Sequence, residues 1–143
     1  MGAPAVAAAV IDTNVVLELL LFADPRTAAL RAALAAGRLR WLATRAMRDE
    51  LQRVLGRPML QTWRPDVPTV LQAFDERAVA VEPAPTTPLL RCRDGDDQMF
   101  IDLALAQRVD WLLSRDRAVL ALRRRAAALG LAIGEPEQLV PAE

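Results

Sequence analysis

Residues 6–14 read Val-Ala-Ala-Ala-Val-Ile-Asp-Thr-Asn, an apolar run that stops at a carboxylate. A short, continuous apolar run bounded by polar residues is typical of a strand buried on both faces of a parallel sheet. We therefore predict a strand over 6–11 that carries Asp12 at its carboxyl end. An ionised side chain so close to a core needs a partner, because burying an unpaired charge is costly. The alternative role for Asp12 is an N-cap of a helix that begins near Asn14.

Similar apolar runs recur along the chain, separated by helical patterns. The further predicted strands are 39–43, 78–81, 110–114 and 131–133, and the predicted helices are 15–22, 26–36, 45–55, 65–77, 96–107 and 117–129. This alternation predicts an α/β fold with three α/β/α layers and a mostly parallel central sheet of about five strands. The length fits one domain over 1–143. Ligands of such sheets bind beyond the carboxyl ends of the strands, where the strand order reverses.

The composition excludes several kinds of catalysis. Histidine and lysine are absent, and Cys92 is the only cysteine. Ser-His-Asp catalysis, histidine-rich zinc sites, the lysine of a P-loop and an internal disulfide are therefore excluded. Eighteen arginines balance 18 acids, so no global field indicates a nucleic-acid partner. Carboxylates, hydroxyls, arginines and any bound metal remain for chemistry.

The sequence favours a cytoplasmic location and no membrane association. The apolar residues 1–10 carry no positive charge, so we do not expect a signal peptide. The apolar run 15–22 is interrupted by Glu18 and is too short to span a bilayer. The single cysteine, Cys92, fits a reducing compartment.

An acid-rich segment, Cys-Arg-Asp-Gly-Asp-Asp over 92–97, opens the helix predicted at 96–107. Capping and the helix dipole explain one acid, for which Asp94 or Asp96 is the better cap. Three acids within four residues exceed what a cap needs and indicate a cation. Asp97 shares the helix face that packs on the sheet, so it is the better ligand.

Glu50 is distinguished from its neighbour Asp49 by helical geometry. At about 100° per residue, Glu50 lies at the border of the apolar face of helix 45–55, whereas Asp49 points to the opposite side. We predict that Glu50 leans toward the sheet edge. The alternative is a surface glutamate paired with Arg53 or Arg57.

Asp116 follows the strand at 110–114 and repeats the strand-then-acid pattern of the first strand. Its alternative role is an N-cap for the helix at 117–129. Like charges crowded at one sheet edge cannot all stay ionised without compensation. Oxygen ligands without histidine or cysteine suit Mg²⁺ or Mn²⁺. Four acids are predicted to share this edge: Asp12, Glu50, Asp97 and Asp116.

In these segments the chain resembles the PIN-domain family of metal-dependent ribonucleases over nearly its whole length. It is most similar to the bacterial subgroup that supplies the toxin components of toxin–antitoxin pairs. The resemblance rests on Val-Ile-Asp-Thr-Asn-Val at 10–15, Met-Arg-Asp-Glu-Leu at 47–51, the segment at 92–97, and Leu-Leu-Ser-Arg-Asp at 112–116. There are two departures from the subgroup: Gly95 stands where it usually has proline, and Met99 where it often has lysine.

The resemblance implies a set of site residues. The family's catalytic, metal-binding acids fall on Asp12, Glu50, Asp97 and Asp116. Ser114 takes the place of the supporting hydroxyl, expected to hydrogen-bond an acid. The remaining supporting polar residues are Thr13, Asn14, Asp94 and Asp96.

The resemblance also implies an activity and partners. It implies that a water activated by Mg²⁺ or Mn²⁺ hydrolyses RNA phosphodiester bonds, and that an antitoxin protein binds the chain. The apolar helices predicted within 15–36 favour an antitoxin groove or a homodimer contact. Removing the four site acids leaves 14 acids against 18 arginines, a net charge of +4. The arginines considered for RNA backbone contacts, or as ordinary solvated side chains, are Arg38, Arg40, Arg45, Arg48, Arg115, Arg117 and Arg123 to Arg125.

Two other functions compete with this interpretation. The first is a PIN-like module that binds RNA or protein without cleaving. The second is a phosphatase or phosphoacceptor domain with an aspartyl nucleophile after the first strand. That chemistry usually needs a second aspartate where Asn14 stands, and it needs a lysine, which the chain lacks.

Overall fold

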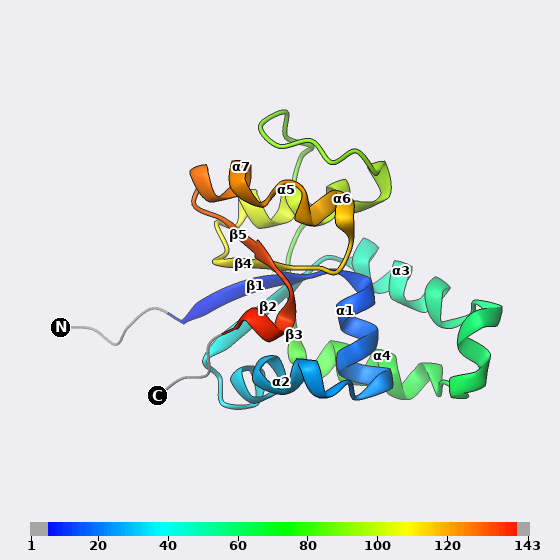
Figure 1. The fold of residues 1–143 in the computed structure, drawn as a ribbon. Helices are drawn as coiled ribbons and strands as arrows, with labels where there is room; N and C mark the ends of the chain where they lie inside the picture. The colour runs from blue at the N-terminus through cyan, green and yellow to red at the C-terminus, as the bar shows by residue number, and fades with distance from the viewer. Residues whose placement is uncertain (1–5, 140–143) are drawn as a thin grey trace.

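The structure, a computed structural model, describes residues 6–139 and arranges them around one parallel sheet (Figure 1). Residues 1–5 and 140–143 lie outside the described part, and with them half of the apolar stretch considered for targeting. The strands are β1 (Ala7–Ile11), β2 (Leu39–Ala43), β3 (Ala78–Ala80), β4 (Trp111–Leu113) and β5 (Ala132–Gly134). Their order is β3-β2-β1-β4-β5, and every neighbouring pair is parallel. The predicted α/β fold with a five-stranded sheet is confirmed.

The first strand lies at the centre of this sheet. Ala9 pairs with Trp41 of β2 on one side and with Trp111 of β4 on the other. Ala9 and Val10 are fully buried, which explains why β1 is an unbroken apolar run. The chain builds outward from β1 to β2 and β3, then returns to place β4 on its other side. The strand order therefore reverses between β1 and β4, and their carboxyl ends border the crevice where such folds bind ligands.

Helices cover both faces of the sheet. Figure 1 places α5, α6 and α7 over one face and α1, α2 and α4 over the other. The α-helices are α1 (Thr13–Leu17), α2 (Ala28–Ala35), α3 (Arg45–Leu55), α4 (Val67–Arg77), α5 (Gln98–Ala106), α6 (Arg117–Leu120) and α7 (Arg123–Ala128). The short turns are η1 (Glu18–Phe22), η2 (Pro25–Thr27), η3 (Pro58–Trp63), η4 (Gly95–Asp97) and η5 (Pro136–Gln138). In the described part of the chain, no helix is both long and apolar enough to cross a membrane.

Three local predictions are corrected by the structure. The helix expected over 117–129 divides into α6 and α7, because Leu122 N donates to the carbonyl of Val119 and tightens the turn. The helix expected over 15–22 begins two residues earlier, and its second half, η1, is a π-turn. The acid-rich segment forms a separate turn of 3-10 helix, η4, before α5 begins.

Candidate metal centre

Asp12 stands at the end of β1, beside the end of β4. It is 4% exposed, and it occupies the N-cap position of α1 without accepting a capping hydrogen bond. Its Oδ2 instead accepts a 2.6 Å hydrogen bond from Ser114 Oγ. The carboxylate therefore does not act as an N-cap, which was the alternative considered for it. It is held between the carboxyl ends of β1 and β4.

The electrostatics of Asp12 reflect this position. Burial raises the pKa of Asp12 from 3.8 to about 6, although the hydrogen bond from Ser114 favours the ionised form. The negative charges of Glu50 and Asp116 raise the pKa further. A buried acid with two acidic neighbours is short of positive charge, and a bound cation would supply it.

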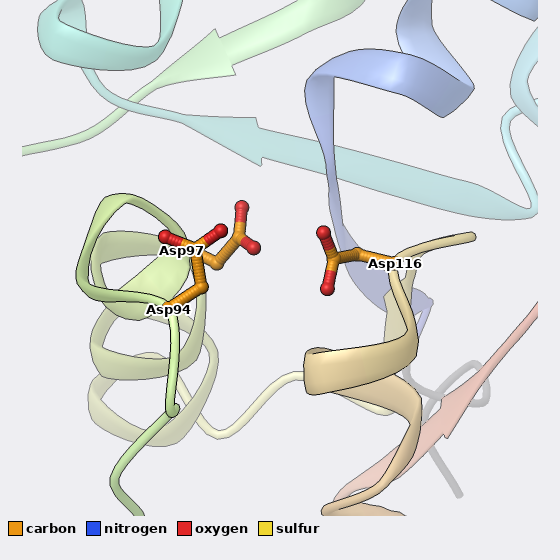
Figure 2. Close-up of side chains that lie close together, drawn as sticks. All are labelled: Asp94, Asp97 and Asp116. Atoms are coloured by element: carbon orange, nitrogen blue, oxygen red, sulfur yellow. The ribbon is translucent and has the colours of Figure 1, made fainter.

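Three aspartates meet across the crevice. One carboxylate oxygen from each of Asp94, Asp97 and Asp116 lies within 4.8 Å of the others. Figure 2 shows Asp94 and Asp97 beside the start of α5, and Asp116 facing them from the start of α6. Two of these acids also cap turns: Asp94 Oδ1 accepts from Asp96 N at 3.0 Å, and Asp116 Oδ1 accepts from Ala118 N at 2.8 Å. Capping therefore accounts for one oxygen of Asp94 and one of Asp116.

Capping does not account for Asp97. It occupies the N-cap position of α5, yet its side chain accepts no capping hydrogen bond. Its Oδ2 is shielded from solvent and has no hydrogen-bond partner among the described residues. Burial and the charges of Asp12, Asp116 and Asp94 raise the pKa of Asp97 to about 7. A buried carboxylate oxygen without a donor is rare and unfavourable, and it marks the place where a cation would complete the site.

The donor set suits a hard divalent cation. The atoms that meet here are carboxylate oxygens, and the whole chain contains no histidine. Mg²⁺ and Mn²⁺ prefer such oxygens and complete their coordination with water, whereas zinc sites favour histidine and cysteine. The residues present therefore fit Mg²⁺ or Mn²⁺.

Glu50 approaches the same region from α3. It is half-buried, and its carboxylate accepts a hydrogen bond from Thr13 Oγ1, on the residue that follows Asp12. Among residues 6–139 it forms no ion pair, so the alternative of a pair with Arg53 or Arg57 is wrong. Its neighbour Asp49 instead pairs with Arg45 at 3.3 Å on the exposed side of α3.

The other predicted supporting residues divide into two groups. Ser114 is fully buried, and its hydroxyl accepts from Asp116 N at 3.0 Å while it donates to Asp12, which confirms the expected hydrogen bond to an acid. Asn14 and Asp96 are exposed, and neither side chain hydrogen-bonds to the acids within residues 6–139. The structure therefore joins Ser114 and Thr13 to the predicted acids by hydrogen bonds and places Asp94 in the aspartate cluster. Asn14 and Asp96 make no such side-chain contact among the described residues.

Sequence reasoning missed a buried polar pair on α5 that holds the coil leading into η4. Gln98 Nε2 donates to Asp102 Oδ1 and to Leu90 O, both at 2.9 Å. Gln98 Oε1 accepts from Cys92 N at 2.6 Å, and Asp102 Oδ1 also accepts from Thr87 N at 3.0 Å. Both side chains are buried. Two polar residues four apart in an otherwise apolar helix were the signal that could have revealed this pair.

Arg115 was also misjudged, because its guanidinium group is occupied by glutamates. It donates to Glu18 at 2.7 Å and to Glu137 at 2.7 and 2.9 Å, and it lies 3.5 Å from Glu135. Its side chain is only 15% exposed, and these acids raise its pKa above the ordinary arginine value. Arg115 is therefore neither a free RNA contact nor a solvated arginine. It anchors the segment that carries Asp116.

The family is established by comparison with known proteins. A PIN domain matches residues 8–118, which include all the acids of the crevice. The chain belongs to the PIN domain family. PIN domains are generally metal-dependent nucleases, and the acidic cluster of this chain is consistent with the metal site typical of them. No curated protein matches the chain.

Proposed function

We propose that the protein is an endoribonuclease that uses Mg²⁺ or Mn²⁺ to hydrolyse phosphodiester bonds in RNA. The observation that carries this proposal is Asp97 Oδ2, a buried oxygen in a cluster of acids that has no hydrogen-bond partner among residues 6–139. The resemblance to PIN-domain ribonucleases supports RNA as the substrate. The catalytic and metal-binding residues proposed are Asp12, Glu50, Asp97 and Asp116, to which the geometry adds Asp94.

The chain's own side chains supply an arrangement that is set before substrate binds. A bound divalent cation lowers the pKa of water toward neutrality and neutralises charge on phosphate. Ser114 donates to Asp12 and so favours its ionised form. Thr13 orients Glu50, and the cap bond of Asp116 to Ala118 holds that side chain while leaving its second oxygen available. Hydrogen bonds of this kind orient the ligands of a metal site and adjust its affinity for the metal.

We also propose that the protein is the toxin component of a toxin–antitoxin pair. The resemblance to that bacterial subgroup supports this role. Exposed apolar side chains offer a surface for an antitoxin segment or a second copy of the chain: Met59 is 77% exposed, and Trp63, 54% exposed, contacts Phe22 at a ring separation of 4.5 Å. Expression of the native chain should arrest bacterial growth, and expression of Asp97→Asn should not.

A cleavage assay tests the enzymatic proposal. The native protein, Asp12→Asn, Asp97→Asn and the control Asp49→Asn are incubated with several RNAs in Mn²⁺ or Mg²⁺. Asp49 loses the same charge but belongs to an exposed ion pair, which is worth little. We expect the native chain and Asp49→Asn to cleave, and the other two to lose about a hundredfold or more of the rate.

Calorimetric titration with Mn²⁺ provides a second readout. The native chain should bind the ion, and Asp97→Asn should bind it far more weakly. RNA binding without cleavage, together with no Mn²⁺ binding, would instead support the module that binds RNA without cutting it. Cleavage that survives both Asp12→Asn and Asp97→Asn would contradict the proposed site.

A further inference from the structure

A basic hollow lies beside the acid cluster, on the outer surface of α6 and α7. It has a volume of about 490 Å³ and is lined by Arg117, Leu120, Ala121, Arg123 and Arg124. Arg117 and Leu120 lie on α6, Ala121 follows that helix, and Arg123 and Arg124 begin α7. The three arginines and Ala121 are exposed. The hollow therefore presents three guanidinium groups to solvent.

The charges of these arginines are not neutralised by the part of the chain that the structure describes. Arg117, Arg123 and Arg124 form no ion pair within residues 6–139. The segment 117–134 contains no acidic residue at all. In contrast, other arginines considered for RNA contacts are occupied: Arg48 pairs with Asp75, and Arg115 lies among glutamates. The hollow is thus a local concentration of positive charge in a chain whose net charge is zero.

The hollow is joined directly to the acid cluster. Arg117 follows Asp116 in the chain, and Leu120 N donates to Asp116 O at 2.9 Å. The hollow therefore begins next to Asp116 and runs along α6 and the start of α7. A polyanion that enters the acid cluster meets repulsion from the carboxylates, and neighbouring cations would offset that repulsion.

We infer that this hollow binds the phosphate backbone of a single RNA strand whose neighbouring phosphate lies at the acid cluster. The inference rests on the proposed function and names its substrate contact. Guanidinium groups pair with phosphate oxygens through two parallel hydrogen bonds, which makes arginine well suited to this contact. No aromatic side chain lines the hollow, so it contacts backbone without stacking bases. Binding there is therefore independent of base sequence.

Binding of a short fluorescent single-stranded RNA in EDTA, followed by anisotropy at several KCl concentrations, tests the inference. The variant carries Arg117→Gln, Arg123→Gln and Arg124→Gln. We expect its RNA affinity to fall about tenfold or more. The slope of log affinity against log salt should flatten by about 2, because each phosphate contact in a single strand contributes about 0.7.

A matched control removes the same charge at the amino-terminal ends of the strands, opposite the acid cluster. Arg38 and Arg77 directly precede β2 and β3, Arg40 lies near the start of β2, and all three are exposed. The Arg38→Gln, Arg40→Gln, Arg77→Gln variant should bind RNA within about twofold of the native chain. Circular dichroism and thermal melting should show that both variants fold.

The outcomes separate this inference from the proposed function. Native-like affinity and salt slope in the hollow variant overturn the inference, and so does an equal loss in the control variant. The absence of any RNA binding by the native chain also overturns it. The binding assay contains EDTA and does not depend on cleavage. It therefore tests the hollow even if the protein binds RNA without cutting it. In Mn²⁺, the hollow variant should have a higher KM than the native chain and a kcat within about twofold of it. The reason is that the substituted arginines lie beside the acid cluster and are not part of it.

Discussion

The Ser114 hydroxyl donates a 2.6 Å hydrogen bond to Asp12 Oδ2, which joins side chains 102 positions apart in the chain. The same hydroxyl accepts from Asp116 N at 3.0 Å. A single buried oxygen thus sets the positions of two acids that come from the ends of the two central strands. This small connection decides the geometry at the point where the strand order reverses.

Ser114→Ala should lower the free energy of unfolding by about 1–3 kcal/mol, since it leaves a buried carboxylate oxygen and an amide without partners. Urea denaturation measures this loss. Ser114→Thr keeps the hydroxyl and should retain most of the stability. If alanine is tolerated as well as threonine, the hydrogen bond does not contribute as described.

The stability of the metal-free protein should fall as pH rises from about 4 to about 7. The folded pKa values of Asp12, about 6, and Asp97, about 7, exceed the ordinary value of 3.8. The folded state therefore binds more protons than the unfolded state in this window, and raising the pH removes stability. Denaturation in EDTA at about pH 5 and about pH 8 should differ by about 2 kcal/mol, after allowance for the solvent around Asp97.

Two controls accompany this pH prediction. Asp97→Asn should flatten the pH profile, because it removes the acid with the higher of the two pKa values. Mn²⁺ should stabilise the native chain more at the higher pH, because metal ligands bind in their deprotonated form. A metal-free stability that rises with pH through this window would contradict the two raised pKa values.

Asp102→Ala should destabilise the protein by about 1–3 kcal/mol, because Thr87 N loses its acceptor and Gln98 Nε2 loses one of its two acceptors. The coil before Asp94 should also open more often, which amide hydrogen exchange over 82–94 measures. Asp102→Asn retains an acceptor oxygen and should be milder. Unchanged exchange in Asp102→Ala would show that other contacts hold the coil.

Arg115→Met should cost about 3 kcal/mol in stability, because it leaves the buried Glu18 carboxylate without its positive partner. Adding Glu18→Gln should recover part of this loss by removing the uncompensated charge. Chemical denaturation of the two single variants and the double variant gives the coupling between them. Purely additive losses would show that the pair does not interact.

Apolar patterning predicted the strands and longer helices well where burial itself decides the structure. The bounds of β2 and α3 agree with those predicted from sequence, because an apolar run and a one-sided helix are both local patterns. The division between α6 and α7 was not predictable, since Val119 and Leu122 continue the helical apolar pattern across the break. The break depends on one tightened hydrogen bond that leaves no mark on that pattern.

The candidate site was likewise predicted only in part from the sequence. The sequence by itself determined that acids follow β1 and β4, since an apolar strand that ends in a carboxylate is visible in the order of residues. Only the tertiary structure decided that Asp94 joins Asp97 and Asp116, that Asp97 Oδ2 has no partner among the described residues, and that Arg115 turns toward Glu18. The physical reason is that local periodicity reports which side chains are buried, whereas contacts between distant segments depend on how strands and helices pack in three dimensions.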